Sequence, residues 1–379
     1  MAIEVRPIQL PRDARAFIDV WWTVYGKDPH WVPPLLFERL AFLDPKKNPY
    51  FEVSTLQCFI AYEDGRAVGT IAATKDHAFQ AIEPGVGFFG FFEFVDRFEV
   101  AKALFDAAVE WHRAQGMKTV RGPFNFNTNH ECGLLVEPFD SDPLVLMVWN
   151  PAYYVDVYAR LGLVKAQDMY AYWMDNNGRT EQYDRIARLT ERVESRAKGL
   201  TIRSVDVRKF EAELRHVHEV YLDAWEDNWG FVKMTDREFH KMAEGIKDMI
   251  DPHYCYMAFI NGEIAAFSIT LPDYNQVVKP MNGRIFPFGW WHYLTRRSKV
   301  DQMRVFTLGV KKKFRHMNLG LPLYKRTWEA GLARKVKGAE ASWILESNRQ
   351  MRDPLEKMGF RIYKTYRIFE RPVDAATRP

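Results

Sequence analysis

The chain has few of the features that are typical of secreted proteins, of proteins stabilised by a bound metal ion, or of membrane-spanning proteins. Its three cysteines, Cys58, Cys132 and Cys255, lie far apart and show no paired spacing. This pattern argues against a disulfide framework or a zinc ribbon and favours a reducing compartment. The most apolar run, residues 86–95, has about half the length that a membrane-spanning helix needs. Because the N-terminus also lacks an apolar signal core, we expect a cytoplasmic protein.

An excess of one charge is missing as well. The formal net charge is +4 over 379 residues, so an extended nucleic-acid-binding surface is not indicated. The composition, 47% hydrophobic and 27% charged, suits a globular protein with a large core. The length is sufficient for two domains of ordinary size.

Aromatic residues are abundant, at 15% of the chain. They gather in three clusters, at residues 87–94, 150–158 and 285–294. Two interpretations are open for these clusters. They form an aromatic core, or they line a pocket or a membrane-facing patch for an apolar ligand.

The chain also repeats itself. The pairs Arg6/Arg203, Gly65/Gly262 and Gly162/Gly359 share one offset of 197 residues, and the segments around them read alike. A constant offset across three separated segments predicts two copies of one domain. We place the copies at residues 1–176 and 200–379, joined by a polar linking helix within residues 177–199.

Each copy shows the same predicted order of elements. A short strand is followed by helices, a hairpin with an EDG or NG turn, and a strand rich in large apolar residues. An amphipathic helix, a strand, a short helix and a final strand complete the copy. This order predicts a mixed α/β fold with a central sheet in each copy.

A basic loop precedes the amphipathic helix of the second copy, in KKKFRHMNLGLP at residues 311–322. Pro322 suits only the first turn of a helix, so the helix should begin near Leu319–Leu321. Its free N–H groups and positive dipole end would face the loop, and Gly320 would let a ligand approach the backbone. The sequence predicts either a phosphate site or a solvated basic turn.

The equivalent helix of the first copy differs at its start. Asp96 and Glu99 have the spacing of a capping box, with Asp96 as the N-cap. Two carboxylates there would repel an anion. We therefore expect only the second copy to hold a phosphorylated ligand in this way.

These features resemble the GNAT N-acyltransferases, whose pyrophosphate loop has the pattern R/Q-x-x-G-x-G/A. Arg315, His316, Met317, Asn318, Leu319 and Gly320 follow that pattern, with Asn318 in place of the first glycine. Asn can adopt the left-handed conformation that this glycine often takes. Asn348 matches the asparagine after the family's fifth strand, and Met358-Gly359-Phe360 matches its closing segment. The resemblance covers nearly the whole chain twice and implies two tandem GNAT-like domains.

The resemblance implies a coenzyme A thioester as donor, with its pyrophosphate on the backbone of residues 315–321. In the family the thioester carbonyl lies against the strand before the loop, which here offers Leu308, Gly309 and Val310. A fixed N–H donor there would stabilise the developing oxyanion. The resemblance implies no metal.

The family often uses a tyrosine in its closing segment as the acid that protonates the leaving thiolate. The second copy has Leu355 at that position, whereas the first copy keeps Tyr158. This division suggests a composite site, or a site in the second copy with an acid from elsewhere. A buried structural role for Tyr158 is the other interpretation.

An Asn-rich insertion at residues 121–145 occurs only in the first copy. It is either a capped structural turn or a polar site, and it supplies Glu131 and His130 as the first candidates for the general base. Glu93, on an otherwise apolar strand, is the next candidate, since a carboxylate there would have a raised pKa. No orienting residue at a known spacing supports Cys132 as a nucleophile. A metal site made of His130, Glu131 and Cys132 is not expected either, because adjacent residues cannot easily share one ion.

The segments NHECGLLVEPFDSDP and WNPAYYVDVYARLG also resemble a subset of bacterial tandem-GNAT proteins to which bacterial ceramide synthases look similar. Those enzymes acylate a long-chain sphingoid amine from acyl-CoA. The resemblance thus implies acyl-CoA and an amine acceptor, which is a long-chain amine if the aromatics serve a lipid, with peripheral membrane contact as one option.

Two other functions stay open at this point. The chain could be a non-catalytic protein that binds CoA or lipid, because Leu355 and Asn318 depart from the family pattern. It could also use a charged tRNA, although its near-neutral charge and the lack of a long basic arm argue against that.

Overall fold

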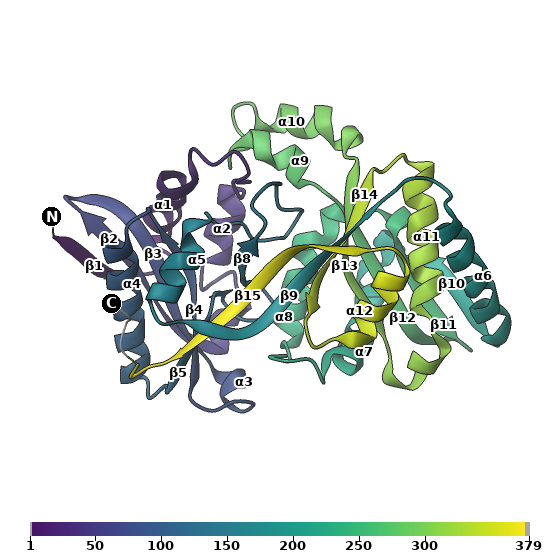
Figure 1. The fold of residues 1–379 in the computed structure, drawn as a ribbon, viewed down its shortest axis with the longest axis horizontal. Coiled ribbons are helices and arrows are strands. Elements are labelled where there is room, and N and C mark those ends of the chain that lie inside the picture. Colours follow the sequence, from purple (N-terminus) through teal and green to yellow (C-terminus); the bar gives the residue numbers. More distant parts are fainter. Residues whose placement is uncertain (1, 376–379) are drawn as a thin grey trace. The chain divides into compact units, whose positions relative to one another are not determined.

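The computed structural model describes residues 2–375. The chain forms two compact units (Figure 1). The first comprises residues up to Met169 together with Val278–Trp290 and the C-terminal stretch from Lys364, and the second comprises Tyr170–Val277 and Trp291–Tyr363. Two segments that follow the linking helix in sequence thus belong to the first unit. The domain ranges 1–176 and 200–379 stay a prediction, since these compact units are defined by contacts and each combines separate stretches of sequence.

The first unit is built on a mainly antiparallel sheet. Its strand order is β1-β2-β3-β4-β5-β15. The bounds are β1 Ile3–Ile8, β2 Ser54–Glu63, β3 Arg66–Asp76, β4 Val86–Phe94, β5 Thr119–Gly122 and β15 Arg361–Pro372. Strands β4 and β5 run parallel, while Phe369–Pro372 of β15 pair antiparallel with β5. The last strand of the chain therefore completes the sheet of the first unit.

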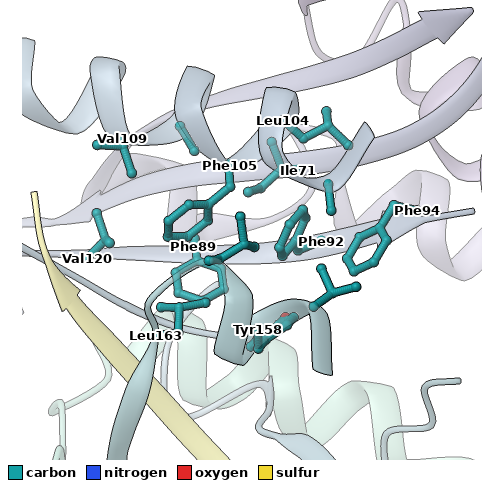
Figure 2. Close-up of a cluster of buried hydrophobic side chains, with 14 of the residues drawn as sticks. Ile71, Phe89, Phe92, Phe94, Leu104, Phe105, Val109, Val120, Tyr158 and Leu163 are labelled. Atoms are coloured by element: carbon teal, nitrogen blue, oxygen red, sulfur yellow. The ribbon is translucent and has the colours of Figure 1, made fainter. Parts of the chain in front are cut away.

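Helices cover both faces of this sheet. They are α1 Ala14–Tyr25, α2 Leu36–Phe42, α3 His77–Gln80, α4 Phe98–Ala114 and α5 Tyr153–Arg160. Alternate residues of a strand point to opposite faces, so each strand feeds two cores. One core joins α4 and α5 to Phe89, Phe92 and Phe94, and Figure 2 shows these rings together with Leu104 and Tyr158. The other core joins α1 to Ile60 and Phe91.

The Asn-rich insertion folds as short strands. These are β6 Phe124–Asn125, β7 Glu131–Cys132 and β8 Leu134–Glu137. Strands β6 and β7 form a separate two-stranded ladder that pairs Asn125 with Glu131. Part of the insertion is thus a structured hairpin, and its role as a polar site stays a prediction.

In the second unit the strand order is β9-β14-β13-β12-β11-β10. The bounds are β9 Val164–Asp175, β10 Leu200–Ser204, β11 Cys255–Ile260, β12 Glu263–Pro272, β13 Gln302–Val310 and β14 Gly338–Leu345. Strands β13 and β14 run parallel, and the pairs β10–β11, β11–β12 and β12–β13 are antiparallel. Strand β9 begins in the sequence of the first unit and continues into the second.

The remaining helices begin with the one that joins the two halves of the sequence. They are α6 Glu181–Arg196, α7 Phe210–Trp225, α8 Asp236–Ile246, α9 Asn275–Val278, α10 Gly289–Arg296, α11 Gly320–Ala333 and α12 Arg349–Lys357. Helix α6 is the predicted linking helix. Tyr324 and Trp328 of α11 are buried, and Leu321 and Leu332 pack partly buried against the same core, as the helical spacing predicted.

The two halves share the order strand, helices, hairpin, strand, helix, strand, short helix and strand, and the mixed α/β fold with tandem GNAT-like halves is confirmed. The hairpin turns show the correspondence most directly. Asp64 and Gly65 have φ of 48° and 78°, and Asn261 and Gly262 have φ of 49° and 87°. Both pairs occupy the left-handed region that a two-residue hairpin of this kind requires. The repeated sequence signal therefore reports a repeated backbone conformation.

The three aromatic clusters have different outcomes. The rings of residues 87–94 and those of Tyr154 and Tyr158 are buried in the first unit. The segment 285–294 carries exposed rings instead. Within residues 2–375, none of the helices combines the length and the apolar character needed to cross a bilayer.

Candidate active site

A β-bulge in β4 shapes the backbone around Phe91 and Glu93 in the first unit. Thr70 pairs with Glu93 and Ala72 pairs with Gly90, so β4 carries an extra residue at this point. Phe91 takes φ of 45°, and its N–H donates to Oδ1 of Asn125 at 2.7 Å. A bulge redirects the side chains that follow it and is common beside active sites.

Glu93 is the residue that this bulge positions. Its neighbours Phe92 and Phe94 lie in the core beneath α4, so alternation directs Glu93 to the face of α1. The hydroxyl of Tyr25, the last residue of α1, donates to Oε2 of Glu93. The hydroxyl of Tyr154, on α5, donates to the same oxygen at 2.9 Å. The residue is half-buried.

The surroundings change the acidity of Glu93. Burial raises its pKa to about 7, against the lowering effect of the hydrogen bonds from Tyr25 and Tyr154. The negative charge of Glu131 raises the pKa further and the positive charge of Arg39 lowers it. A carboxylate with this pKa is half ionised near neutral pH, which suits a general base. Glu93 was the third of the predicted base candidates, and its environment is the most favourable of them.

Glu131 has a different environment on the β6–β7 hairpin. Arg39, on α2, donates to its Oε1, and Nδ2 of Asn125 donates to its Oε2 at 3.1 Å. Burial alone would raise the pKa of Glu131, but Arg39 and Asn125 outweigh burial and lower it. A carboxylate held ionised by an arginine is a weak base at neutral pH. The structure therefore favours a positioning or charge-balancing role for Glu131.

His130 lies next to this pair and is held by polar and aromatic neighbours. Its Nδ1 is 3.0 Å from Oδ1 of Asn127, whose Nδ2 donates to Asp76 at 2.8 Å. The imidazole also meets the rings of Phe42 and Tyr50 edge-on. Burial lowers the pKa of His130 to about 4, so the ring is neutral at physiological pH. A neutral ring with so low a pKa is also a weak base.

Tyr158 lies in the hydrophobic core and not among these polar groups. It is 1% exposed and packs between Phe89, Phe92 and Phe369 (Figure 2). Burial raises the pKa of its hydroxyl well above the ordinary value. These surroundings favour the structural interpretation over the acid role that the resemblance implied. Leu355, at the corresponding place of the second copy, is fully buried as well.

The predicted phosphate loop occupies the expected place in the second unit. A 3-10 helix, η7 Lys312–Met317, ends at Asn318, which has φ of 55° and ψ of 38°. Asn318 thus takes the left-handed conformation that the family's glycine would supply. Helix α11 begins at Gly320 and places Pro322 in its first turn, where the missing N–H costs nothing.

The strand before the loop extends beyond its parallel partner. The ladder between β13 and β14 pairs Gln302–Val305 with Gly338–Ala341, and β13 continues to Val310. Leu308, Gly309 and Val310 lie in this extension. A side-chain carbon added at Gly320 would meet only Leu308 within 4 Å, at 3.6 Å. The backbone of the loop and helix start therefore leaves room for a ligand to approach at Gly320.

The cations of the loop correct one expectation. Their charges are matched by carboxylates of the same unit, chiefly from α7 and the residues after it. The pairs are Lys311 with Glu219 and Glu263, Lys312 with Glu226 and Asp227, and Lys313 with Glu263. Arg315 donates to the carbonyl oxygen of Ala224 at 3.0 Å. A phosphate on this loop would depend on backbone N–H groups and the helix dipole more than on free lysines.

The predicted capping box of the first copy is wrong. Helix α4 begins at Phe98, its N-cap is Arg97, and no side chain caps it. Arg97 has an extended conformation and pairs with Glu63, which fixes the helix start one residue later than Asp96 would. Glu99 remains in the first turn. The carboxylates still disfavour an anion there, but through charge alone.

Asn348 serves as a helix cap in this structure. It is the N-cap of α12, and its Oδ1 accepts from the N–H of Met351 at 3.2 Å. Its position after β14 agrees with the resemblance, and its contact with coenzyme A stays a prediction.

Sequence reasoning missed the partners of both carboxylates. Tyr25 and Arg39 lie far from Glu93 and Glu131 in sequence, so no local motif could reveal them. Tyr154 was seen only as part of an aromatic cluster. Cys132 is buried and forms no disulfide within residues 2–375, and no cluster of three or more metal-ligating side chains lies among the described residues.

Comparisons with known proteins identify the relatives of this chain. It is 35% identical over 379 residues to bacterial ceramide synthase of Caulobacter vibrioides (strain NA1000 / CB15N), with 97% of each chain covered. It is 34% identical over 376 residues to protein YghO of Escherichia coli (strain K12), with 97% of this chain and 95% of the relative covered. None of the available protein-family models matches the chain.

Solved structures support the fold. A tandem GNAT protein from the clavulanic acid biosynthesis pathway covers 99% of this chain and 100% of its own, with a TM-score of 0.59 and 15% identity. A GCN5-related glucosamine N-acetyltransferase region of a fungal β-N-acetylglucosaminidase covers 98% of this chain and 38% of its own, with a TM-score of 0.56 and 12% identity. The chain therefore belongs to the family of bacterial ceramide synthase and protein YghO, and its fold is that of a tandem GNAT protein.

Proposed function

We propose that this protein transfers an acyl group from a coenzyme A thioester to a primary amine, and that the amine is a long-chain, sphingoid-like base. The observation that carries the proposal is Glu93, a half-buried carboxylate with a pKa of about 7 beside a β-bulge. The family relationship supports the acyl transfer, and the ceramide synthase name of one relative suggests the acceptor.

The donor is assigned to the second unit. Residues 315–321 would hold the pyrophosphate with the backbone of η7 and the start of α11. The thioester carbonyl would lie against Leu308–Val310, where a strand N–H can polarise it. The lysines of this loop do not make it a strong anion site by themselves, because carboxylates match their charges. The assignment therefore depends on Asn318 and Gly320.

The proton chemistry is assigned to the first unit. A primary amine reaches the enzyme mainly as an ammonium ion, because its pKa resembles that of lysine, about 10.4. Glu93 would accept a proton from the ammonium group, which frees the nitrogen lone pair for reaction. The C–N bond forms and the C–S bond breaks, and the leaving thiolate takes up the second proton, which the nitrogen loses as it becomes an amide. Tyr25 and Tyr154 keep the carboxylate oriented and stay protonated, because burial raises the pKa of both hydroxyls.

Product analysis with paired donors and acceptors tests this function. Purified protein is incubated with acetyl-CoA or palmitoyl-CoA and with a long-chain amine or a short polar amine, and amides are detected by mass spectrometry. We expect the palmitoyl-CoA and long-chain amine pair to give at least about tenfold more amide than either short partner, because extra buried methylenes strengthen binding. Release of free CoA without any amide would contradict amine acylation. Stoichiometric binding of the acyl-CoA without turnover would instead support a non-catalytic protein that binds CoA or lipid.

A further inference from the structure

The segment from Phe286 to Leu294 exposes large apolar side chains. Phe286 and Phe288 are 78% and 74% exposed, more than any other large hydrophobic residue among those described. Leu294 and Trp291 are 57% and 56% exposed, on or beside the turns of α10. Proteins rarely gather exposed aromatic residues without a partner for them, so this segment requires an explanation.

The base of the segment is firmly held in the first unit. Trp22 donates through Nε1 to Oδ1 of Asn282 at 2.9 Å, and Leu36 N–H donates to the carbonyl of Gly283 at 3.0 Å. Gly283 has φ of 76°, and an added side-chain carbon there would lie 2.5 Å from the ring of Trp22. Lys279 also donates to the carbonyl of Pro29 at 2.6 Å. The exposed rings thus extend from a fixed base and are not part of a loose loop.

Positive charge accompanies the rings. Arg284, Arg296, Arg297 and Lys299 are all exposed, and no ion pair with a described residue neutralises them. The sequence has no aspartate or glutamate between Asp273 and Asp301. Lys279, by contrast, is paired with Asp142. Four cations next to exposed Phe, Trp and Leu side chains match an interfacial membrane segment.

We propose that residues 284–299 form a membrane anchor that docks on a bilayer surface containing anionic lipid. Phe286, Phe288 and Leu294 enter the boundary between headgroups and acyl chains, where their burial is favourable. The four cations lie at the headgroup level and are attracted to anionic lipid. Charge complementarity selects this partner, since a purely apolar protein groove would leave the cations unmatched.

This anchor is independent of the proposed function, because it rests on residues outside the Glu93 cluster and the phosphate loop. Its consequence for that function is direct. A long-chain amine and a long-chain amide both reside in bilayers, so an anchored enzyme would meet its acceptor at the surface.

Vesicle flotation tests the anchor with the full chain. Vesicles of phosphatidylcholine alone and vesicles that also contain phosphatidylglycerol are mixed with wild type, Phe286→Ser/Phe288→Ser and Arg296→Gln/Arg297→Gln. We expect wild type to float with the anionic vesicles and to be released as salt is raised. The double Ser variant should bind at least about tenfold more weakly, because two large apolar groups no longer insert. The double Gln variant should bind anionic vesicles more weakly while its weak binding to neutral vesicles is unchanged.

Matched exposed positions serve as controls. Ile82→Ser removes another large hydrophobic side chain, 57% exposed, and Arg66→Gln removes another exposed arginine. Both should bind like wild type, and circular dichroism confirms that each variant is folded. Equal flotation of the double Ser variant and wild type overturns the proposal. The proposal is also overturned if the wild-type protein does not bind vesicles but forms dimers through these rings, because the segment would then be a contact between copies.

Discussion

Glu93→Gln should lower kcat by about 10²- to 10⁴-fold, the usual contribution of a positioned general base, while the affinity for coenzyme A is unchanged. Glutamine keeps the shape and can still accept hydrogen bonds from the hydroxyls of Tyr25 and Tyr154. It cannot accept the proton of an ammonium substrate. Steady-state kinetics with palmitoyl-CoA and a long-chain amine measure the loss, and calorimetric titration with CoA checks the binding.

Two other substitutions make this result specific. Glu131→Gln should cost less, because the lowered pKa of Glu131 and its pairing with Arg39 already make it a weak base. Glu99→Gln, in the exposed first turn of α4, should have no effect on turnover. If Glu131→Gln abolishes turnover while Glu93→Gln is active, then Glu131 is the base and the assignment proposed above is wrong.

Gly320→Trp should abolish coenzyme A binding, to below the detection limit of calorimetry. Only Leu308 lies near the site where the new side chain would start, so the protein can fold around the indole. The indole would then fill the space in front of the helix N-terminus that a pyrophosphate needs. The titration uses acetyl-CoA and palmitoyl-CoA with wild type and variant.

The matched control is Gly245→Trp, in α8 of the same unit. An added side-chain carbon at Gly245 meets nothing within 4 Å, so the substitution introduces the same bulk at an exposed helix position. It should bind CoA like wild type, and so should Asp96→Ala in the first copy. Normal CoA binding by Gly320→Trp would remove residues 315–321 as the pyrophosphate site.

Local sequence signals predicted the elements well, because they report local physics. The EDG and NG turns, Pro322 and Asn318 each have a backbone conformation that their residue type favours, and the structure shows those conformations. The capping box at Asp96 failed, although its spacing was right, because Arg97 takes an extended conformation and an ion pair with Glu63 instead. A short pattern cannot include such a competing contact.

The candidate site depended on contacts between distant parts of the chain. Glu93 was recognisable as a carboxylate in an apolar strand, but the tyrosines that hold it come from α1 and α5. The same holds for the loop lysines, whose charges are matched by Glu219, Glu226 and Glu263. The charges read from a loop alone therefore overstate its attraction for phosphate.

The pH dependence of kcat/KM tests the central claim most directly, because it reports the ionisation of the base in the free enzyme. Glu93 must be deprotonated to act, so activity should be low in acid and rise through its pKa of about 7. The hydrogen bond from Tyr25 lowers that pKa, so Tyr25→Phe should move the rise to higher pH. A rise near pH 4.5, or one that Tyr25→Phe leaves unmoved, would contradict Glu93 as the base.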